Sequence, residues 1–143
     1  VIGYNRSHSH DDITYTDLNT LLQTSDIVSI HLPLTKDTKH FIDKEKLSLM
    51  KKDAILINTA RGGIIDNEAL AEALKKGEIA GAGIDVFDME PPLPEDYPLL
   101  SAPHTVLTPH VGFDTEEAMK RRAAIVADNL KSFVEGKQKN IIC

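Results

Sequence analysis

The chain of 143 residues is about the size of one domain, which is enough to bury a sizeable core. Its formal net charge of -6 at pH 7 and its lack of Trp argue against a surface for nucleic acid or anionic lipid, so we expect neither partner. No apolar run approaches the roughly 20 residues of a membrane span, and the single Cys143 leaves no pair for a disulfide or a Cys-based metal site. We therefore expect a cytoplasmic protein that holds no metal.

Apolar residues run together in some stretches and recur every three or four positions in others, which predicts strands that alternate with helices. In chain order we expect a strand at residues 1–4, a helix at 17–24, a strand at 27–32, a helix at 44–50, a strand at 54–57, a helix at 67–76, a strand at 79–86, an irregular loop at 87–103, a strand at 105–108 and a helix at 114–135. This alternation is typical of a parallel, doubly wound α/β sheet.

Residues at the element boundaries agree with this order. Thr16, Asp43 and Asp66 are side chains that can cap the start of a helix. Gly77 follows the third predicted helix and can adopt the left-handed conformation that commonly ends a helix. The all-apolar run 54–57 suits a strand that is covered on both faces.

A dinucleotide-binding half begins with a strand, a Gly-rich turn and a helix, and no G-x-G-x-x-G occurs in this chain. The nearest candidate, the run 81–83, lies inside a predicted strand and has Val86 at the position of the third Gly. We therefore expect residues 1–143 to form a single, partial dinucleotide-binding domain of the Rossmann-like type. We expect its first strand, its Gly-rich loop and a substrate domain to be missing.

Polar residues follow three predicted strands at the same edge of the sheet. Arg61 lies just after one strand, Asp85 lies at the end of the next with Glu90 five positions later, and His110 lies just after the last. An Arg can hold a carboxylate through two hydrogen bonds. A His beside a carboxylate keeps its proton and can act as a general acid toward a carbonyl oxygen. Together these residues predict a redox site for a 2-hydroxy acid and its 2-oxo acid, with hydride supplied by a nicotinamide cofactor.

Each of these residues also has an ordinary structural interpretation. An Arg in a Gly-Gly loop is commonly structural, and a His after Pro commonly makes hydrogen bonds within its loop. A carboxylate in a Pro-rich loop, such as Glu90, is commonly solvated, and Asp85 can pair with a neighbour. The shared edge of the sheet is what favours a functional interpretation.

Three segments carry a family resemblance. Residues 57–63, 81–92 and 107–112 resemble the D-isomer-specific 2-hydroxyacid dehydrogenases, and the similarity extends over essentially the whole chain. It covers only the later part of that family's cofactor domain. The resemblance implies a fragment of an oxidoreductase that transfers hydride between NAD(P)H and a small 2-oxo or 2-hydroxy acid.

The resemblance also implies roles for particular residues. Arg61 would hold the substrate carboxylate and carbonyl, His110 would be the acid/base, and Glu90 would keep His110 protonated. Glu90 favours a hydroxy acid over formate, because the formate dehydrogenases of the family lack this carboxylate. The residues placed against an NAD or NADP cofactor are Asn5, Arg6, Pro33, Thr59, Ala60, Arg61, Asp85, His110 and Gly112.

Asn5 departs from the family pattern, since many NAD-specific members have an acidic residue there that bonds the ribose hydroxyls. The neutral Asn5 with Arg6 and Ser7 after it could accommodate a 2′-phosphate, which predicts a relaxed or NADP-leaning preference. A solvent-facing Arg in a turn is the alternative.

Other interpretations stay open at the level of sequence. A co-repressor-type, NAD(H)-sensing interaction protein of the same family would share these residues, and a generic α/β domain with an accidental triad is a third reading. The resemblance leaves 3-phosphoglycerate, glycerate or hydroxypyruvate, glyoxylate and D-lactate as substrates. We expect the chain by itself to be inactive and to self-associate, as a homodimer or otherwise, because a sheet without its first strand has unpaired edges.

Overall fold

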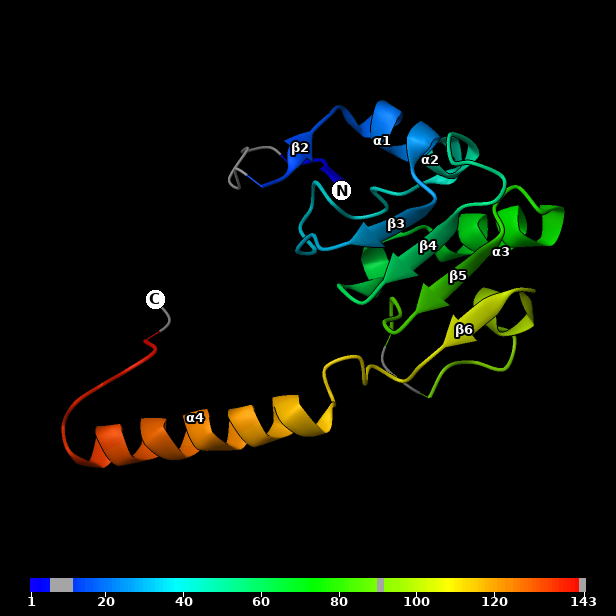
Figure 1. Ribbon diagram of the computed structural model, residues 1–143. Coiled ribbons are helices and arrows are strands. Elements are labelled where there is room, and N and C mark those ends of the chain that lie inside the picture. Colours follow the sequence, from blue (N-terminus) through cyan, green and yellow to red (C-terminus); the bar gives the residue numbers. More distant parts are fainter. Residues whose placement is uncertain (6–11, 90–91, 142–143) are drawn as a thin grey trace. The chain divides into compact units, whose positions relative to one another are not determined.

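The computed structural model describes residues 1–5, 12–89 and 92–141, and it forms two compact units, Val1–His110 and Val111–Cys143. In the first unit the strands are β1 (Ile2–Gly3), β2 (Thr14–Tyr15), β3 (Ile27–Ile30), β4 (Ile55–Asn58), β5 (Gly81–Ile84) and β6 (Thr105–Leu107). Its helices are α1 (Leu18–Thr24), α2 (Lys44–Ser48) and α3 (Asn67–Lys76), with 3-10 turns η1 (Gly62–Ile64) and η2 (Pro98–Ser101). The second unit holds α4 (Glu116–Val134) (Figure 1).

All strand pairs are parallel, and they form two separate sheets. One sheet has the order β3-β4-β5-β6, so neighbouring strands follow one another in the chain with a helix or turn between them (Figure 1). The other is the short pair β1-β2. The alternation of parallel strands with helices confirms the predicted Rossmann-like α/β fold.

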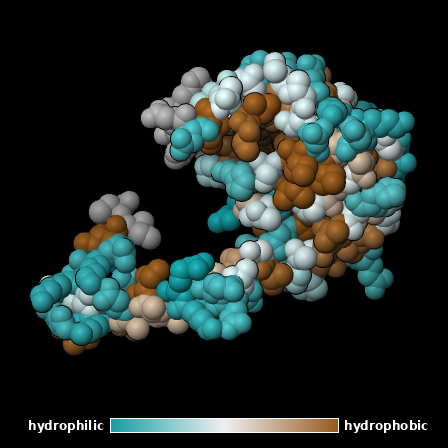
Figure 2. Space-filling model, viewed as in Figure 1, coloured by the Kyte–Doolittle hydropathy of each residue, from teal (hydrophilic) through white to brown (hydrophobic). Residues whose placement is uncertain are grey.

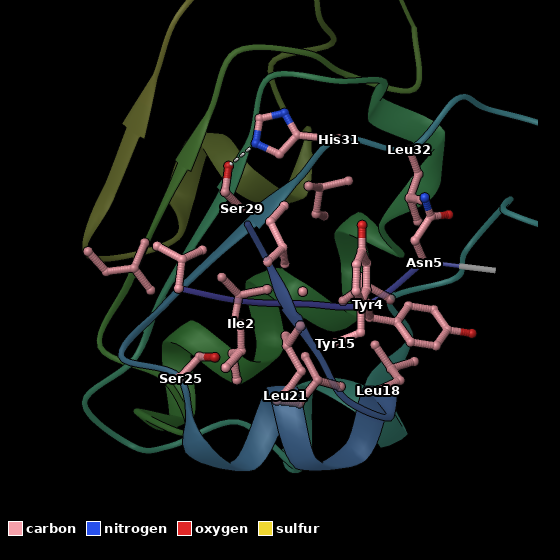
Figure 3. Close-up of a pocket in the computed structure, with 18 of the residues that line it drawn as sticks. Ile2, Tyr4, Asn5, Tyr15, Leu18, Leu21, Ser25, Ser29, His31 and Leu32 are labelled. Atoms are coloured by element: carbon pink, nitrogen blue, oxygen red, sulfur yellow. Dashed lines mark hydrogen bonds between the residues drawn. The ribbon is translucent and has the colours of Figure 1, made fainter. Parts of the chain in front are cut away.

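A cavity of about 540 Å³ lies between β1 of one sheet and β3 of the other. Residues of β1 and β3 line it, together with apolar side chains of α1 such as Leu18 and Leu21. No ladder joins β1 to β3 among the described residues. Figure 2 shows apolar side chains around a hollow in this unit, and Figure 3 shows side chains of both sheets that line the cavity.

Within the first unit, the described residues cover the four-stranded sheet on one face only. Leu56 and Ile84 are buried in a core with Leu47 of α2, Leu70 of α3 and Leu99 of η2. On the opposite face, the exposed side chains are Ile27, Ile55 and Val106. The expectation that the strand at 54–57 is covered on both faces is therefore wrong here, because its side chains alternate between the core and the open face.

The helix boundaries follow the predicted caps, with one exception. Asp43 accepts a hydrogen bond from the Lys46 N–H, Asp66 accepts one from the Ala69 N–H, and Gly77 is left-handed at φ 64°. For α1 the predicted cap Thr16 is wrong. Asp17 accepts the Thr20 N–H instead, while the Thr16 N–H is bound to the Gly3 carbonyl.

The Pro-rich segment after β5 is not wholly irregular. It contains η2, whose Leu99 is fully buried, and Tyr97 just before it is 5% exposed. The Tyr97 ring packs edge-on against Phe87 with 5.7 Å between centroids, and its hydroxyl donates to Asp88 Oδ1 at 2.6 Å. The segment thus returns to the core that it leaves at β5.

In the second unit, α4 has the predicted length to within a few residues. Thr115 caps it by accepting the Ala118 N–H, and left-handed Gly136 follows its end. The apolar side chains of Val126, Leu130 and Phe133 on this helix are exposed. No helix among the described residues is long and apolar enough to cross a membrane.

Candidate active site

The ends of β4, β5 and β6 lie side by side, because Asn58 pairs with Ile84 and Ile84 pairs with Leu107. The loops that follow these strands therefore leave the same edge of the sheet, which is where open α/β sheets bind ligands. Arg61, Asp85 and His110 lie in or at the start of these loops, as predicted.

The Arg61 loop is held by a buried amide that the sequence prediction missed. Asn58 is 0% exposed. Its Nδ2 donates to the Arg61 carbonyl at 3.0 Å, and its Oδ1 accepts the Ala60 N–H at 3.0 Å. The Arg61 side chain is exposed, and its Nη1 donates to the Ala60 carbonyl at 2.6 Å. The signal that could have identified Asn58 is a polar residue that ends an apolar strand just before a loop.

Gly62 packs the same loop directly onto the chain that follows β5. A Cβ atom at Gly62 would lie 1.9 Å from the Phe87 carbonyl carbon, so only glycine fits. On the other side of the loop, the Gly63 carbonyl accepts the His40 N–H at 2.8 Å. The backbone around Arg61 is thereby enclosed by two other segments.

Asp85 connects the Arg61 loop to His110. Its N–H donates to the Asn58 carbonyl at 3.0 Å, and its carbonyl accepts the His110 N–H at 2.8 Å. The Asp85 carboxylate is buried and accepts a hydrogen bond from Thr108 Oγ1. His110 is held in the left-handed region at φ 58°, which is uncommon for a non-glycine residue and is often found at functional sites.

Other predicted site residues lie elsewhere. Asn5 and Pro33 line the cavity between β1 and β3 (Figure 3), and Gly112 belongs to the second unit. Glu90 and Arg6 lie outside the described residues. In the Arg61 loop, Thr59 is exposed and Ala60 is partly buried. Thr108, which bonds Asp85, is a further residue that the sequence prediction missed.

The donor set at this edge suits the reacting end of a nicotinamide cofactor with an acid beside it. An exposed guanidinium, a buried carboxylate and a half-buried imidazole lie at or just after three adjacent strand ends. The chain contains no Gly-rich turn to cradle a pyrophosphate. Among residues 1–5, 12–89 and 92–141, no group of three or more His, Cys, Asp or Glu residues could hold a metal ion.

The family profile described as "D-isomer specific 2-hydroxyacid dehydrogenase, NAD binding domain" matches residues 1–112. The chain belongs to this family. It is 54% identical over 125 residues to a glyoxylate reductase of Thermofilum pendens, an alignment that covers 87% of this chain and 37% of the relative.

Two solved structures are similar to this chain over nearly all of its length. An acyclic imino acid reductase in complex with NADPH and D-Arg has a TM-score of 0.86 and 37% identity, over 100% of this chain and 46% of that chain. A D-lactate dehydrogenase with NAD+ from Lactobacillus jensenii has a TM-score of 0.86 and 33% identity, over 98% and 47% respectively. The chain thus spans less than half the length of these relatives.

Proposed function

We propose that this chain is part of an NAD(P)-dependent D-2-hydroxyacid dehydrogenase that interconverts a small 2-oxo acid and its 2-hydroxy acid. The observation that carries the proposal is the backbone of Asp85, which bonds both the strand that leads to Arg61 and His110. The segments that carry Arg61, a cation for a carboxylate, and His110, an acid/base for a carbonyl, are thereby both bonded to the end of β5. In this proposal residues 1–143 are a partial dinucleotide-binding domain.

Each residue has a distinct role in the proposed reaction. Arg61 binds the substrate carboxylate and orients the neighbouring carbonyl. His110 donates a proton to the carbonyl oxygen during reduction and removes it from the hydroxyl in the reverse direction. Glu90 keeps His110 protonated, and a bound nicotinamide supplies or accepts the hydride.

The proposed substrates are small 2-oxo and 2-hydroxy acids. The glyoxylate reductase and the D-lactate dehydrogenase above carry the names of such acids. The proposed partners are therefore this substrate and NAD or NADP, which Asn5, Arg6, Pro33, Thr59, Ala60, Arg61, Asp85, His110 and Gly112 would contact.

A relaxed or NADP-leaning preference is part of the proposal. Its support is the neutral Asn5, which is exposed at the edge of the β1-β3 cavity, and the NADPH bound to the imino acid reductase. Turnover with NADH and with NADPH should differ little or favour NADPH in the full-length protein, and Asn5→Asp should shift it toward NADH. A strong NADH preference of the unaltered protein contradicts this part.

The catalytic role of His110 is tested in the full-length protein with glyoxylate, hydroxypyruvate and pyruvate as substrates. Replacing His110 by Gln should lower kcat by about 100-fold or more, because no other group delivers the proton. His104→Gln is the matched control, since His104 also has a positive φ of 56° but is exposed before β6.

Two results would contradict the proposed function. One is a His110→Gln variant with unchanged kcat. The other is an unaltered full-length protein that binds NADH yet reduces no 2-oxo acid, which would favour the co-repressor-type alternative. The chain of 143 residues tested alone should bind no cofactor tightly and show no turnover.

A further inference from the structure

The side-chain amide of Asn58 is fully buried and makes two hydrogen bonds to the Arg61 loop. Both ends of the amide are used, one toward the Arg61 carbonyl and one toward the Ala60 N–H. Together they close a turn of four residues in which the backbone of Arg61 is extended, at φ −151° and ψ 136°. The direction in which Arg61 leaves the strand therefore depends on a side chain that is itself buried.

A second buried amide, Asn67, shows that a buried Asn does not always bond a neighbouring loop. Asn67, at the first turn of α3, is 7% exposed, and neither its Nδ2 nor its Oδ1 has a hydrogen-bond partner among the described residues. Buried polar groups are normally paired. Asn58 is paired at both ends, and both partners belong to the loop that holds Arg61.

We propose that Asn58 is a positioning residue that aims the Arg61 guanidinium at the substrate carboxylate. This inference rests on the proposed function, in which Arg61 binds that carboxylate. Asn58 touches neither substrate nor cofactor in this account, because it is fully buried beneath the loop. It acts by holding the Arg61 backbone, while the next residue, Gly62, packs directly against the Phe87 backbone.

The test measures how strongly the full-length enzyme prefers a carboxylate. The ratio of kcat/KM for pyruvate to that for pyruvamide, its uncharged analogue, reports on the cation that binds the carboxylate. Asn58→Leu has a similar volume but no hydrogen bonds, and it should lower this ratio by about tenfold or more, since a small displacement of a binding group has large kinetic effects. Asn58→Ser, which can still accept the Ala60 N–H, should lower the ratio less.

A double-mutant cycle with Arg61→Gln separates positioning from a general loss of structure. If Asn58 acts through Arg61, Asn58→Leu should change the ratio little once Arg61 has been replaced. Asn67→Leu is the matched control and should leave the ratio as it is in the unaltered enzyme. If Asn58→Leu does not fold, the same cycle with Asn58→Ser decides the question.

The outcomes distinguish this inference from the proposed function. If Arg61→Gln leaves the ratio unchanged, Arg61 does not bind the carboxylate, and the roles of both residues are overturned. If Arg61→Gln collapses the ratio but the Asn58 variants keep it, or if the two effects simply multiply, only the role of Asn58 is overturned. A ratio that falls in both single variants and no further in the double variant supports the inference.

Discussion

At the scale of single residues, two glycines are required for different reasons. Gly62 needs space, because its Cβ would overlap the Phe87 backbone at 1.9 Å. Gly77 needs conformational freedom, because its φ is 64° and nothing lies within 4 Å of its Cβ position. A Cβ atom that overlaps backbone atoms costs more stability than one on a left-handed residue, because other residues adopt the left-handed conformation at modest cost.

We therefore predict that Gly62→Ala destabilises the protein by about 3 kcal/mol or more, while Gly77→Ala costs about 1 kcal/mol. Denaturant unfolding of the two variants and the unaltered chain measures the difference. Equal costs for the two substitutions would contradict the tight contact between Gly62 and Phe87.

At the scale of elements, Asp43 controls the start of the short helix α2. The hydrogen bond from Lys46 Nζ, at 2.8 Å, lowers the pKa of the Asp43 carboxyl below its usual range. A lowered pKa means that the carboxylate stabilises the fold at neutral pH and that this contribution is lost as the pH falls below about 4. The carboxylate also caps the helix by accepting the Lys46 N–H.

Replacing Asp43 by Ala should cost about 1 kcal/mol at pH 7, as the loss of an N-cap does. The difference from the unaltered chain should shrink at pH 3, because the Asp43 carboxyl of the unfolded chain is largely protonated there. Unfolding curves at both pH values test this, with the exposed Glu95→Ala as a control that should have little effect at either pH. A cost that is the same at pH 3 and pH 7 would show that the charge plays no part.

The segment between β5 and η2 is closed by a hydrogen bond from the Tyr97 hydroxyl to Asp88. Burial of the ring and this bond raise the pKa of Tyr97 well above its usual value. A raised pKa means that the neutral phenol stabilises the fold below about pH 10, and that this contribution is lost as the pH rises above that value.

Tyr97→Phe should therefore cost about 1 kcal/mol at pH 7, the net contribution of one hydrogen bond. The difference in stability between this variant and the unaltered chain should narrow above pH 10. Ionisation of Tyr97 then stabilises the unfolded state of the unaltered chain and lowers its stability. Thermal unfolding from pH 7 to pH 11 checks this, with Tyr4→Phe as the control at an exposed hydroxyl. A gap that widens with pH would contradict the sign.

At the scale of the whole molecule, the first unit has surfaces that parallel sheets rarely leave uncovered. The edges of β1 and β3 face a cavity, and Ile27, Ile55 and Val106 are exposed on the open face of the larger sheet. Unpaired edges and apolar sheet faces favour association with other chains.

We predict that the 143-residue chain self-associates in solution, and that Ile27→Lys on β3 weakens the association. A charge on an edge strand opposes pairing with another chain. Sedimentation velocity over a range of concentrations measures the state, with Gln23→Lys on the exposed side of α1 as a control of equal charge. A chain that remains monomeric at every concentration would contradict this prediction.

Local signals in the sequence were sufficient for most of the fold. The alternation of strands and helices, the caps Asp43 and Asp66 and the left-handed Gly77 were predicted correctly, because they depend on residues within one turn of each other. The short strand β2 was missed, since two residues carry too little periodicity to be recognised.

The candidate site was only partly accessible from the sequence. The order of the strands predicted that Arg61, Asp85 and His110 follow neighbouring strand ends. The hydrogen bonds that attach them to one another could not be predicted, because they join residues far apart in the chain and depend on the register of β4, β5 and β6. Burial of Asn58 and the contact of Gly62 with Phe87 likewise exist only once the strands have paired. Periodicity and capping are local properties, whereas the burial of Asn58 and the exposure of the sheet faces follow from packing between distant segments.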